Sequence, residues 1–238
     1  MISVVMPAHD EEALLASSVR EVADGLRPRG EFELLVVENG STDGTAAVAR
    51  SLAEEIPEVQ ALTLSTPDYG LALRTGFLAA TGEYVAIFDV DYYDLTFLGQ
   101  AVDVLDETDG PAIVVGSKRG LGSVDTRAWP RRLVTSVFAG ILRWGFGLGV
   151  SDTHGMKVMR RKPLVALAEA CRFGTDLFDT ELVLRAERTG LRAAEIPVVV
   201  TELRPSRSSI LRRIPRTVRG LARLRIALWR EDRAGQAA

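Results

Sequence analysis

Residues 85 to 94 read VAIFDVDYYD, and this stretch decides how the rest of the chain is interpreted. Its first half is apolar and rich in β-forming residues, as in a buried strand, whereas its second half holds three aspartates within six positions. In an extended chain Asp89 and Asp91 point to the same face, where two carboxylates repel each other unless a cation or a proton lies between them. The stretch therefore predicts a strand that ends in a cation-binding site.

The first half of the chain repeats this alternation of short apolar runs and helix-like stretches, which is typical of an α/β fold. We expect a mostly parallel central sheet flanked by helices. Strands are predicted at 2–6, 33–37, 59–64, 84–88 and 112–115, and helices at 11–24, 44–55, 70–81 and 94–107. Ligands of such sheets bind beyond the carboxyl ends of the strands, where the polar clusters at 8–12, 38–43 and 89–94 are expected to meet.

The second half is predicted to be mainly helical and to end in a basic segment. Helices at about 127–147, 162–172 and 176–189 precede a strand at 194–201. Nine arginines and no acid lie from Arg204 to Arg230, while the rest of the chain has 20 basic residues against 32 acidic ones. An apolar stripe at helical spacing runs through this segment, formed by Ile210, Ile214, Val218, Leu221, Leu224 and Leu228. We therefore predict a main domain at 1–203 and a basic amphipathic C-terminal helix with its tail at 204–238.

Cysteine content and hydropathy restrict the setting of the protein. Its one cysteine, Cys171, excludes an internal disulfide, indicates a reducing compartment and is expected in the core or in a helix. The amino terminus lacks the pattern of a signal peptide. The longest apolar stretch, 133–150, contains Arg143 and several glycines, so we expect no membrane-spanning helix. No nucleic-acid-binding module accompanies the basic helix, so nucleic acid is not an expected partner.

Six stretches, taken in order, resemble the family 2 glycosyltransferases, and among them the dolichol-phosphate mannose synthase-like group. They are VVMPAHDEE (4–12), LLVVENGSTDGT (34–45), YGLALRTGFLAATGEYVAIFDVD (69–91), VVGSKR (114–119), SDTHGMKVMRR (151–161) and FDTELVLRAERTGLRAAEIPV (178–198). The resemblance implies a GT-A fold, a nucleotide-sugar donor and a divalent metal, Mg²⁺ or Mn²⁺. Asp89 and Asp91 would then form the DxD motif that holds the metal.

The resemblance also implies which residues bind the donor. They are Pro7, Ala8, Asp10, Glu11, Glu38, Arg74, Asp89 and Lys118. This chain departs from the family pattern at Tyr92 and Tyr93, which follow the second aspartate, and at Glu38 and Asn39, where the family most often has two aspartates. Several alternatives stay open: Asp94 as metal ligand or helix cap, the tyrosines over the sugar or in the core, and Arg74 on the donor phosphate or in a structural ion pair.

The basic residues of the second half suggest an acceptor that has a phosphate group. A phosphate monoester arrives largely ionised, so it needs cations more than a general base. The candidate cations are Arg127 and Arg131, beside an aromatic-rich helix, and Arg204 and Arg207, which the resemblance places near the acceptor phosphate. For a hydroxyl acceptor, Glu181 or Asp152 would be the candidate base, with Asp179 close by.

A membrane surface is the expected location of this acceptor. The helix at 209–230 has the features of an interfacial anchor, an apolar stripe with Trp229 on an otherwise cationic helix. Alternatively, the stripe packs on the main domain and the arginines pair with its acidic surface.

Taken together, these features predict a metal-dependent inverting glycosyltransferase. It would move a hexose, mannose from GDP-mannose or a hexose from a UDP-sugar, to a polyprenyl phosphate, and it would lie peripherally on an anionic membrane, at the cytoplasmic face of the cell membrane. Two alternatives remain. One is a family 2 enzyme with a soluble hydroxyl acceptor, and the other is a catalytically silent glycosyltransferase-like membrane adaptor.

Overall fold

The computed structural model describes residues 1–117, 124–125, 140–150, 153, 155–174, 177–200 and 210–236. Its strands are β1 (Ile2–Ala8), β2 (Phe32–Asn39), β3 (Val59–Leu64), β4 (Tyr84–Ile87), β5 (Ile113–Ser117), β6 (Val124–Asp125), β7 (Lys157–Arg160), β8 (Ala193–Pro197) and β9 (Val199–Val200). Its helices are α1 (Leu15–Leu26), the short 3-10 helix η1 (Arg27–Arg29), α2 (Thr45–Glu55), α3 (Tyr69–Ala79), α4 (Leu95–Leu105), α6 (Arg161–Ala170), α7 (Phe178–Arg188) and α8 (Ile210–Gln236). Residues 140–146 are helical as well.

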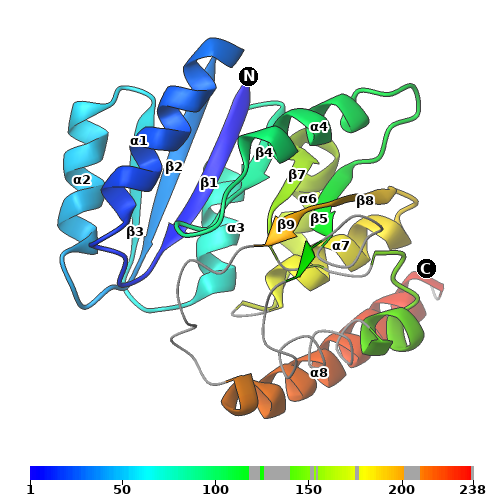
Figure 1. Ribbon diagram of the computed structural model, residues 1–238. Helices are drawn as coiled ribbons and strands as arrows, with labels where there is room; N and C mark the ends of the chain where they lie inside the picture. Colours follow the sequence, from blue (N-terminus) through cyan, green and yellow to red (C-terminus); the bar gives the residue numbers. More distant parts are fainter. Residues whose placement is uncertain are drawn as a thin grey trace.

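A seven-stranded sheet in the order β3-β2-β1-β4-β7-β5-β8 forms the centre of the protein (Figure 1). All neighbouring strands are parallel except β7, which runs antiparallel to β4 and to β5 on either side. A separate two-stranded sheet pairs β6 with β9. The predicted α/β class and the mostly parallel sheet are therefore confirmed.

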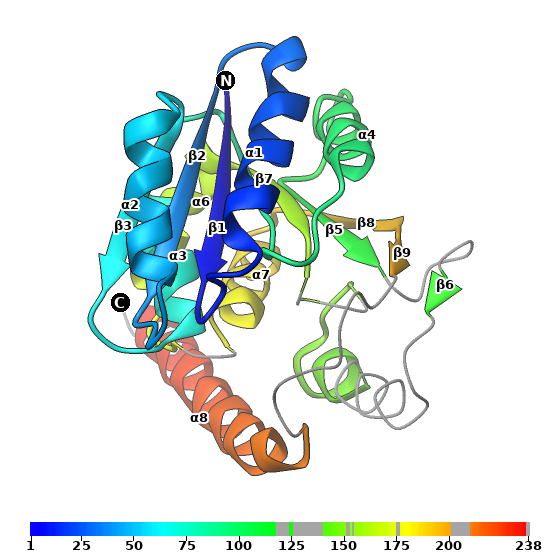
Figure 2. The same cartoon turned by 60° about the vertical axis from the view of Figure 1, so that its left-hand side comes forward.

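Both faces of the sheet are covered, which explains why the middle of β1, β2 and β4 is a continuous apolar run. Val5 and Leu35 belong to a core on the face of α3, α6, α7 and α8, whereas Val4 and Leu34 belong to a core on the face of α1, α2 and α4. Figure 2 shows α1 and α4 on one side of the sheet. α3 approaches the sheet so closely that a Cβ at Gly76 would lie 2.3 Å from the Cγ1 of Val5.

The predicted elements agree with the structure in the first half, apart from the start of one helix, and differ from it in the second half. No pattern in the sequence indicated β7, and the strand expected at 194–201 is divided at Val198 into β8 and β9. The helix expected from residue 11 begins at Leu15, because residues 9–12 form a loop. Residues 127–139 of the expected helix at 127–147 lie outside the described residues. Cys171, at the end of α6, is buried as predicted, and burial raises the pKa of its thiol to about 12.

The C-terminal helix α8 packs against the main body through part of its apolar stripe. Leu221, Leu224 and Leu228 are buried in the core that contains α7, whereas Val218 is 51% exposed. Within the described residues, no helix is both long enough and apolar enough to span a membrane.

Candidate active site

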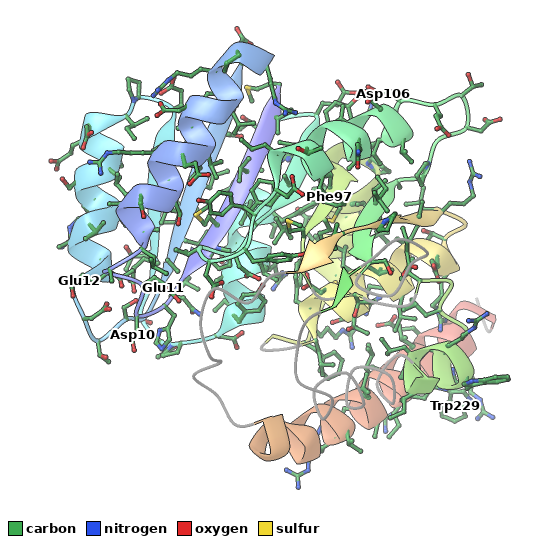
Figure 3. The ribbon with its side chains drawn as sticks, in the orientation of Figure 1. Asp10, Glu11, Glu12, Phe97, Asp106 and Trp229 are labelled. Atoms are coloured by element: carbon green, nitrogen blue, oxygen red, sulfur yellow. The ribbon has the colours of Figure 1, made fainter. Side chains whose placement is uncertain are left out.

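The carboxyl ends of three neighbouring strands bring the predicted acidic residues to one edge of the sheet. β1 pairs with β2, where Ala8 lies beside Glu38, and with β4 on its other side. Asp89 follows the end of β4. Figure 3 shows Asp10 and its neighbours at this edge, at the end of the molecule opposite to Asp106. The three polar clusters meet at one edge, as the sequence predicted.

Hydrogen bonds join the loop after β1 to the loop after β2. The Asp10 carboxylate accepts from the backbone N–H of Thr42 at 2.7 Å, and its own N–H donates to the Ser41 hydroxyl at 3.1 Å. The N–H of Glu11 donates to the hydroxyl of Thr45 at 2.7 Å. The bond from the Thr42 backbone lowers the pKa of Asp10, so this carboxylate is ionised at neutral pH. The two loops are therefore fixed before any ligand binds.

Glu38 and Asn39, which stand where the family most often has two aspartates, lie buried at the end of β2. Glu38 is 2% exposed, and its Oε1 accepts from the backbone N–H of Ser41 at 2.6 Å. The side-chain oxygen of Asn39 accepts from the N–H of Asp68, the first residue before α3, at 2.7 Å. In this structure both side chains shape the strand-end loops, and donor binding by Glu38 stays a prediction.

The DxD motif adopts a tight turn, so the extended geometry expected for it is wrong. The backbone N–H of Asp89 donates to the carbonyl of Tyr92 at 3.1 Å, and the N–H of Tyr92 donates to the carbonyl of Asp89 at 3.2 Å. Val90 and Asp91 form the tip of this turn. Two half-buried carboxylates thus project from one closed turn at the end of β4.

The two aspartates have different surroundings. The hydroxyl of Tyr69, at the start of α3, donates to Oδ1 of Asp89 at 2.8 Å. Asp91 lines a groove of about 560 Å³ between α1 and the turn. The Ser18 hydroxyl of α1 donates to the carbonyl of Val90 at 2.7 Å, which ties the turn to that helix. The motif is therefore held from both faces of the sheet.

These residues fit a divalent metal that binds together with a diphosphate. Carboxylate oxygens are the ligands that Mg²⁺ and Mn²⁺ prefer, and Mg²⁺ is usually held by one or two carboxylates plus substrate phosphates. Asp89 and Asp91 supply two carboxylates within one turn. The described residues contain no cluster of three or more His, Cys, Asp or Glu that could hold a metal ion. A metal at this turn would thus share its coordination with the donor.

Asp94 and the two tyrosines make contacts with α4, α1 and the core. Asp94 caps α4, because its Oδ1 accepts from the N–H groups of Thr96 and Phe97 at 2.7 and 3.1 Å. Tyr92 and Tyr93 pack against the core on the α1 and α4 face. The hydroxyl of Tyr93 donates to Glu21 of α1 at 2.7 Å, at the wall of the groove. For Asp94, the helix-cap alternative is the one observed.

Arg74 lies away from the metal motif. Its guanidinium donates to the backbone carbonyls of Ala168 and Glu169, at 3.1 and 2.7 Å, in the last turn of α6. The last carbonyls of a helix lack partners one turn further on. Arg74 binds that of Glu169 and shares that of Ala168 with the backbone N–H of Cys171, which lies 3.3 Å away. The structure therefore gives Arg74 a structural contact that neither alternative foresaw, and donor binding by this residue stays a prediction.

Glu181, predicted as a catalytic residue, is fully buried in α7. Its Oε2 accepts from the backbone N–H groups of Arg172 and Phe173, both at 2.9 Å, and its Oε1 pairs with the guanidinium of Arg185 at 2.8 Å. A residue of this kind in a helix could also have been exposed, and the structure excludes that for Glu181. Both oxygens bind structural partners, and the role as a base stays a prediction.

A buried ion pair between Lys157 and Asp179 was not found from the sequence. Nζ of Lys157, on β7, lies 2.9 Å from Oδ2 of Asp179, on α7, and the side chains are 1% and 3% exposed. Next to Asp179, the hydroxyl of Thr180 lies 2.8 Å from that of Thr153. The only sequence signal was an acid in the first turn of a predicted helix.

The remaining predicted site residues lie outside the described residues. They are Lys118, the acceptor-phosphate residues Arg127, Arg131, Arg204 and Arg207, and Asp152. Their roles stay predictions.

Comparisons with known proteins agree with this geometry. The family model described as glycosyl transferase family 2 matches residues 3–167. An uncharacterized glycosyltransferase of Mycobacterium tuberculosis (strain H37Rv) is 34% identical over 199 residues, which cover 83% of this chain and 84% of the relative. A dolichyl-phosphate β-glucosyltransferase of Drosophila melanogaster is 30% identical over 220 residues, which cover 85% of this chain and 67% of the relative.

A solved structure has the same architecture. It is a mannosyltransferase from Pyrobaculum calidifontis, in complex with GDP-Man and Mn²⁺, with a TM-score of 0.61 and 26% identity. The match covers 90% of this chain and 60% of that chain. In the present chain a seven-stranded sheet has acidic strand ends, and the family model matches most of the chain. Together with the relatives, this shows that the chain is a transferase with the GT-A fold and belongs to glycosyltransferase family 2.

Proposed function

We propose that this chain transfers a hexose from a nucleotide sugar to a polyprenyl phosphate, with inversion at the anomeric carbon and with Mg²⁺ or Mn²⁺ at Asp89 and Asp91. The turn at 89–92 carries the proposal, because it holds two carboxylates at the end of β4, beside the strand end that bears Asp10. A nucleoside diphosphate repels such carboxylates. A divalent cation between them removes the repulsion, so donor and metal would bind together.

Each residue of the strand ends has a part in this reaction. A bound metal would stabilise the negative charge that grows on the leaving diphosphate. Tyr69 orients the Asp89 carboxylate through its hydrogen bond of 2.8 Å. The bonds from Thr42 to Asp10 and from Glu11 to Thr45 hold the nucleotide-side loops in one geometry, which lowers the entropy cost of binding the donor.

The state of the candidate bases supports a phosphate acceptor. Glu181 has both oxygens bound to structural partners, and Asp179 is buried against Lys157. A hydroxyl acceptor needs a base that can reach it, whereas a phosphate monoester has a second pKa near 6 and is largely ionised already. Because neither described candidate base is exposed, the ionised acceptor suits this chain better.

The donor has two candidates. The sequence resemblance favours GDP-mannose, and the solved mannosyltransferase in complex with GDP-Man and Mn²⁺ supports the same choice. The dolichyl-phosphate β-glucosyltransferase relative supports a glucose donor instead, and UDP-glucose is then the UDP-hexose to test. The reaction would take place at the cytoplasmic face of the cell membrane, where a polyprenyl phosphate is embedded.

Calorimetric titration of the full chain with GDP-mannose and with UDP-glucose, each with and without Mn²⁺, tests the proposal. We expect one donor to bind, and to bind only with the metal. The double variant Asp89→Asn/Asp91→Asn should lose this binding. Asp109→Asn is the matched control, because Asp109 is exposed in the loop between α4 and β5 and its φ of 61° is one that Asn adopts readily.

Two results would contradict the proposal. Donor binding that needs no metal and survives in the double variant would show that Asp89 and Asp91 do not form a metal site. Absence of any nucleotide binding would favour the silent adaptor. Transfer of radiolabelled sugar to a polyprenyl phosphate then tests the acceptor, and transfer only to a water-soluble hydroxyl compound would favour the soluble-acceptor alternative.

A further inference from the structure

The helix α8 has two apolar faces, and only one of them is used inside the protein. Leu221, Leu224 and Leu228, at spacings of 3 and 4, are 4%, 0% and 2% exposed. A Cβ at Gly220 would lie 2.2 Å from Cδ1 of Leu177, so the helix backbone lies against the chain just before α7. This inner face, and with it most of the described part of the predicted lipid-facing stripe, is docked on the protein.

An ion pair on the same side of the helix holds it in place. Glu231 accepts from Arg185 of α7 at 2.9 Å and pairs with Arg172 at 3.5 Å. Hydrogen bonding to Arg185 lowers the pKa of Glu231. The one acidic side chain that the structure describes on α8 is therefore turned toward α7 and away from the outer face.

The outer face of α8 is apolar in a second row. Val218, Ile226 and Trp229 are 51%, 50% and 50% exposed. At 3.6 residues per turn they fall in one sector of roughly 80°, whose centre lies about 120° around the helix from that of the inner row. A second exposed tryptophan, Trp144 at 90%, lies in the helical segment 140–146. The guanidinium of Arg225 lies 5.7 Å from the centre of the Phe146 ring, which connects the two helices.

Arginines surround these exposed apolar side chains. They are Arg143, Arg219, Arg223, Arg225, Arg230 and Arg233, all exposed. Among the residues that the structure describes, none of the six forms an ion pair with an acidic side chain. Arg233 instead stacks on the ring of Trp229, at 4.0 Å from its centre. The expected alternative, in which the arginines pair with the acidic main domain, is not what these six show.

We propose that this outer face, formed by Ile141, Trp144, Val218, Ile226, Trp229 and the six arginines, binds the surface of an anionic lipid bilayer while α8 stays docked on α7. Exposed tryptophans beside arginines are typical of elements that lie in the bilayer interface, where the ring enters the headgroup region and the cations attract anionic lipid. A second copy of the chain is a poor occupant, because a symmetric dimer through this face would bring arginines against arginines.

The position of the outer face relative to the active site deepens the proposed function. In Figure 1, α8 runs along the end of the molecule toward which the carboxyl ends of β1 and β2 point. A bilayer on the outer face would thus lie near the edge of the sheet that bears the proposed donor site. This step rests on the proposed lipid acceptor, whereas binding of the bilayer itself does not.

Flotation of the full chain with vesicles of phosphatidylcholine and phosphatidylglycerol (3:1), and of phosphatidylcholine alone, tests the proposal. We expect binding to the mixed vesicles only, weakened by salt, because exposed charges are screened. Arg223→Gln/Arg230→Gln should weaken it on the order of tenfold, at up to about 1 kcal/mol for each arginine. Arg50→Gln/Arg192→Gln, which removes two exposed arginines elsewhere, should have no effect. Trp144→Ser/Trp229→Ser should reduce binding and abolish any blue shift of tryptophan fluorescence from these two residues.

Three outcomes would overturn the proposal. The first is that the chain does not bind the mixed vesicles. The second is that the two arginine double variants lose equal amounts of vesicle binding. The third is that sedimentation shows a dimer and that the tryptophan variant is a monomer. Thermal melts of each variant show whether it is folded. Donor titration in the absence of vesicles separates this proposal from the proposed function. Loss of vesicle binding with intact donor binding contradicts only the membrane face, and the reverse contradicts only the donor site.

Discussion

Lys157 and Asp179 form an ion pair inside the protein, with 2.9 Å between Nζ and Oδ2. Lys157 comes from β7, between β4 and β5, and Asp179 comes from the first turn of α7, where the helix dipole favours a carboxylate. Neither Nζ nor the two carboxylate oxygens make a hydrogen bond of good geometry with another described group. The two charges therefore depend on each other for compensation.

We expect the single variants Lys157→Met and Asp179→Leu to lower the free energy of unfolding by roughly 3–5 kcal/mol each, because each leaves one buried charge alone. The double variant Lys157→Met/Asp179→Leu should be much less destabilised than the sum of the two. Urea unfolding of all four proteins gives the coupling energy. If the two losses simply add, the pair does not stabilise the fold in the way that we infer.

The same ion pair explains why β7 could not be predicted. A charged residue opens a strand of four residues, KVMR, so the apolar pattern that revealed β1, β2 and β4 is missing there. The charge is tolerated only because Asp179, 22 positions later, is folded against it. A local sequence pattern predicts strands in which every buried residue is apolar. It fails where a residue far along the chain makes the burial of a charge possible.

The candidate site divides in the same way. Strand ends rich in acids predicted the edge where Asp10, Glu38 and Asp89 gather, because parallel strands end at the same side of a sheet. The local environment of each side chain could not be predicted. Glu181 is enclosed by backbone N–H groups and Arg185, and Arg74 binds the carbonyls that end α6. The contact of Arg74 joins elements that lie far apart in the sequence, whereas that of Glu181 depends on how the chain folds back between α6 and α7, and neither leaves a periodic pattern.

Tyr69→Phe should weaken metal-dependent donor binding while leaving the fold intact. The variant removes only the hydroxyl that donates to Oδ1 of Asp89 at 2.8 Å. A loss of about 1 kcal/mol, or roughly fivefold in affinity, is expected for one hydrogen bond of this kind. Tyr84→Phe is the matched control, because its hydroxyl donates to Asp106 in the same way at the opposite end of the sheet. Equal donor affinity in Tyr69→Phe and the wild type would show that Tyr69 does not orient Asp89.

Gly40→Ala should destabilise the loop after β2 more than an ordinary glycine replacement does. Gly40 has a φ of 61°, and an added Cβ would lie 2.8 Å from backbone atoms of Thr66 and Pro67, which cannot rotate away. Gly147→Ala is the control, since Gly147 has a φ of 72° and an added Cβ there would meet nothing within 4 Å. Thermal melts should show the larger loss for Gly40→Ala, by at least about 1 kcal/mol beyond the strain of the left-handed backbone. Equal melting temperatures would mean that the loop moves aside.

Glu33 should make the stability of the protein depend on pH in the acid range. It lies on β2 at the amino-terminal edge, 7% exposed, where burial by itself would raise its pKa. Its hydrogen bonds from the hydroxyl of Ser3 and from the N–H and hydroxyl of Thr81 outweigh burial and lower the pKa below its ordinary value. The ionised form is thus favoured in the folded state.

A lowered folded-state pKa fixes the sign of this pH dependence. The unfolded chain binds a proton at Glu33 before the folded chain does, so its contribution to stability is full above about pH 5 and is lost as the pH falls through the folded pKa. Glu33→Gln keeps an acceptor for Ser3 and Thr81 but cannot ionise. Urea unfolding between pH 3 and 7 should therefore show a smaller loss of stability on acidification for Glu33→Gln than for the wild type. The exposed Glu54→Gln should keep the wild-type slope. If stability falls equally with pH in the wild type and in Glu33→Gln, other carboxylates cause the acid sensitivity. The bonds from Ser3 and Thr81 would then not distinguish the charged from the neutral side chain of Glu33.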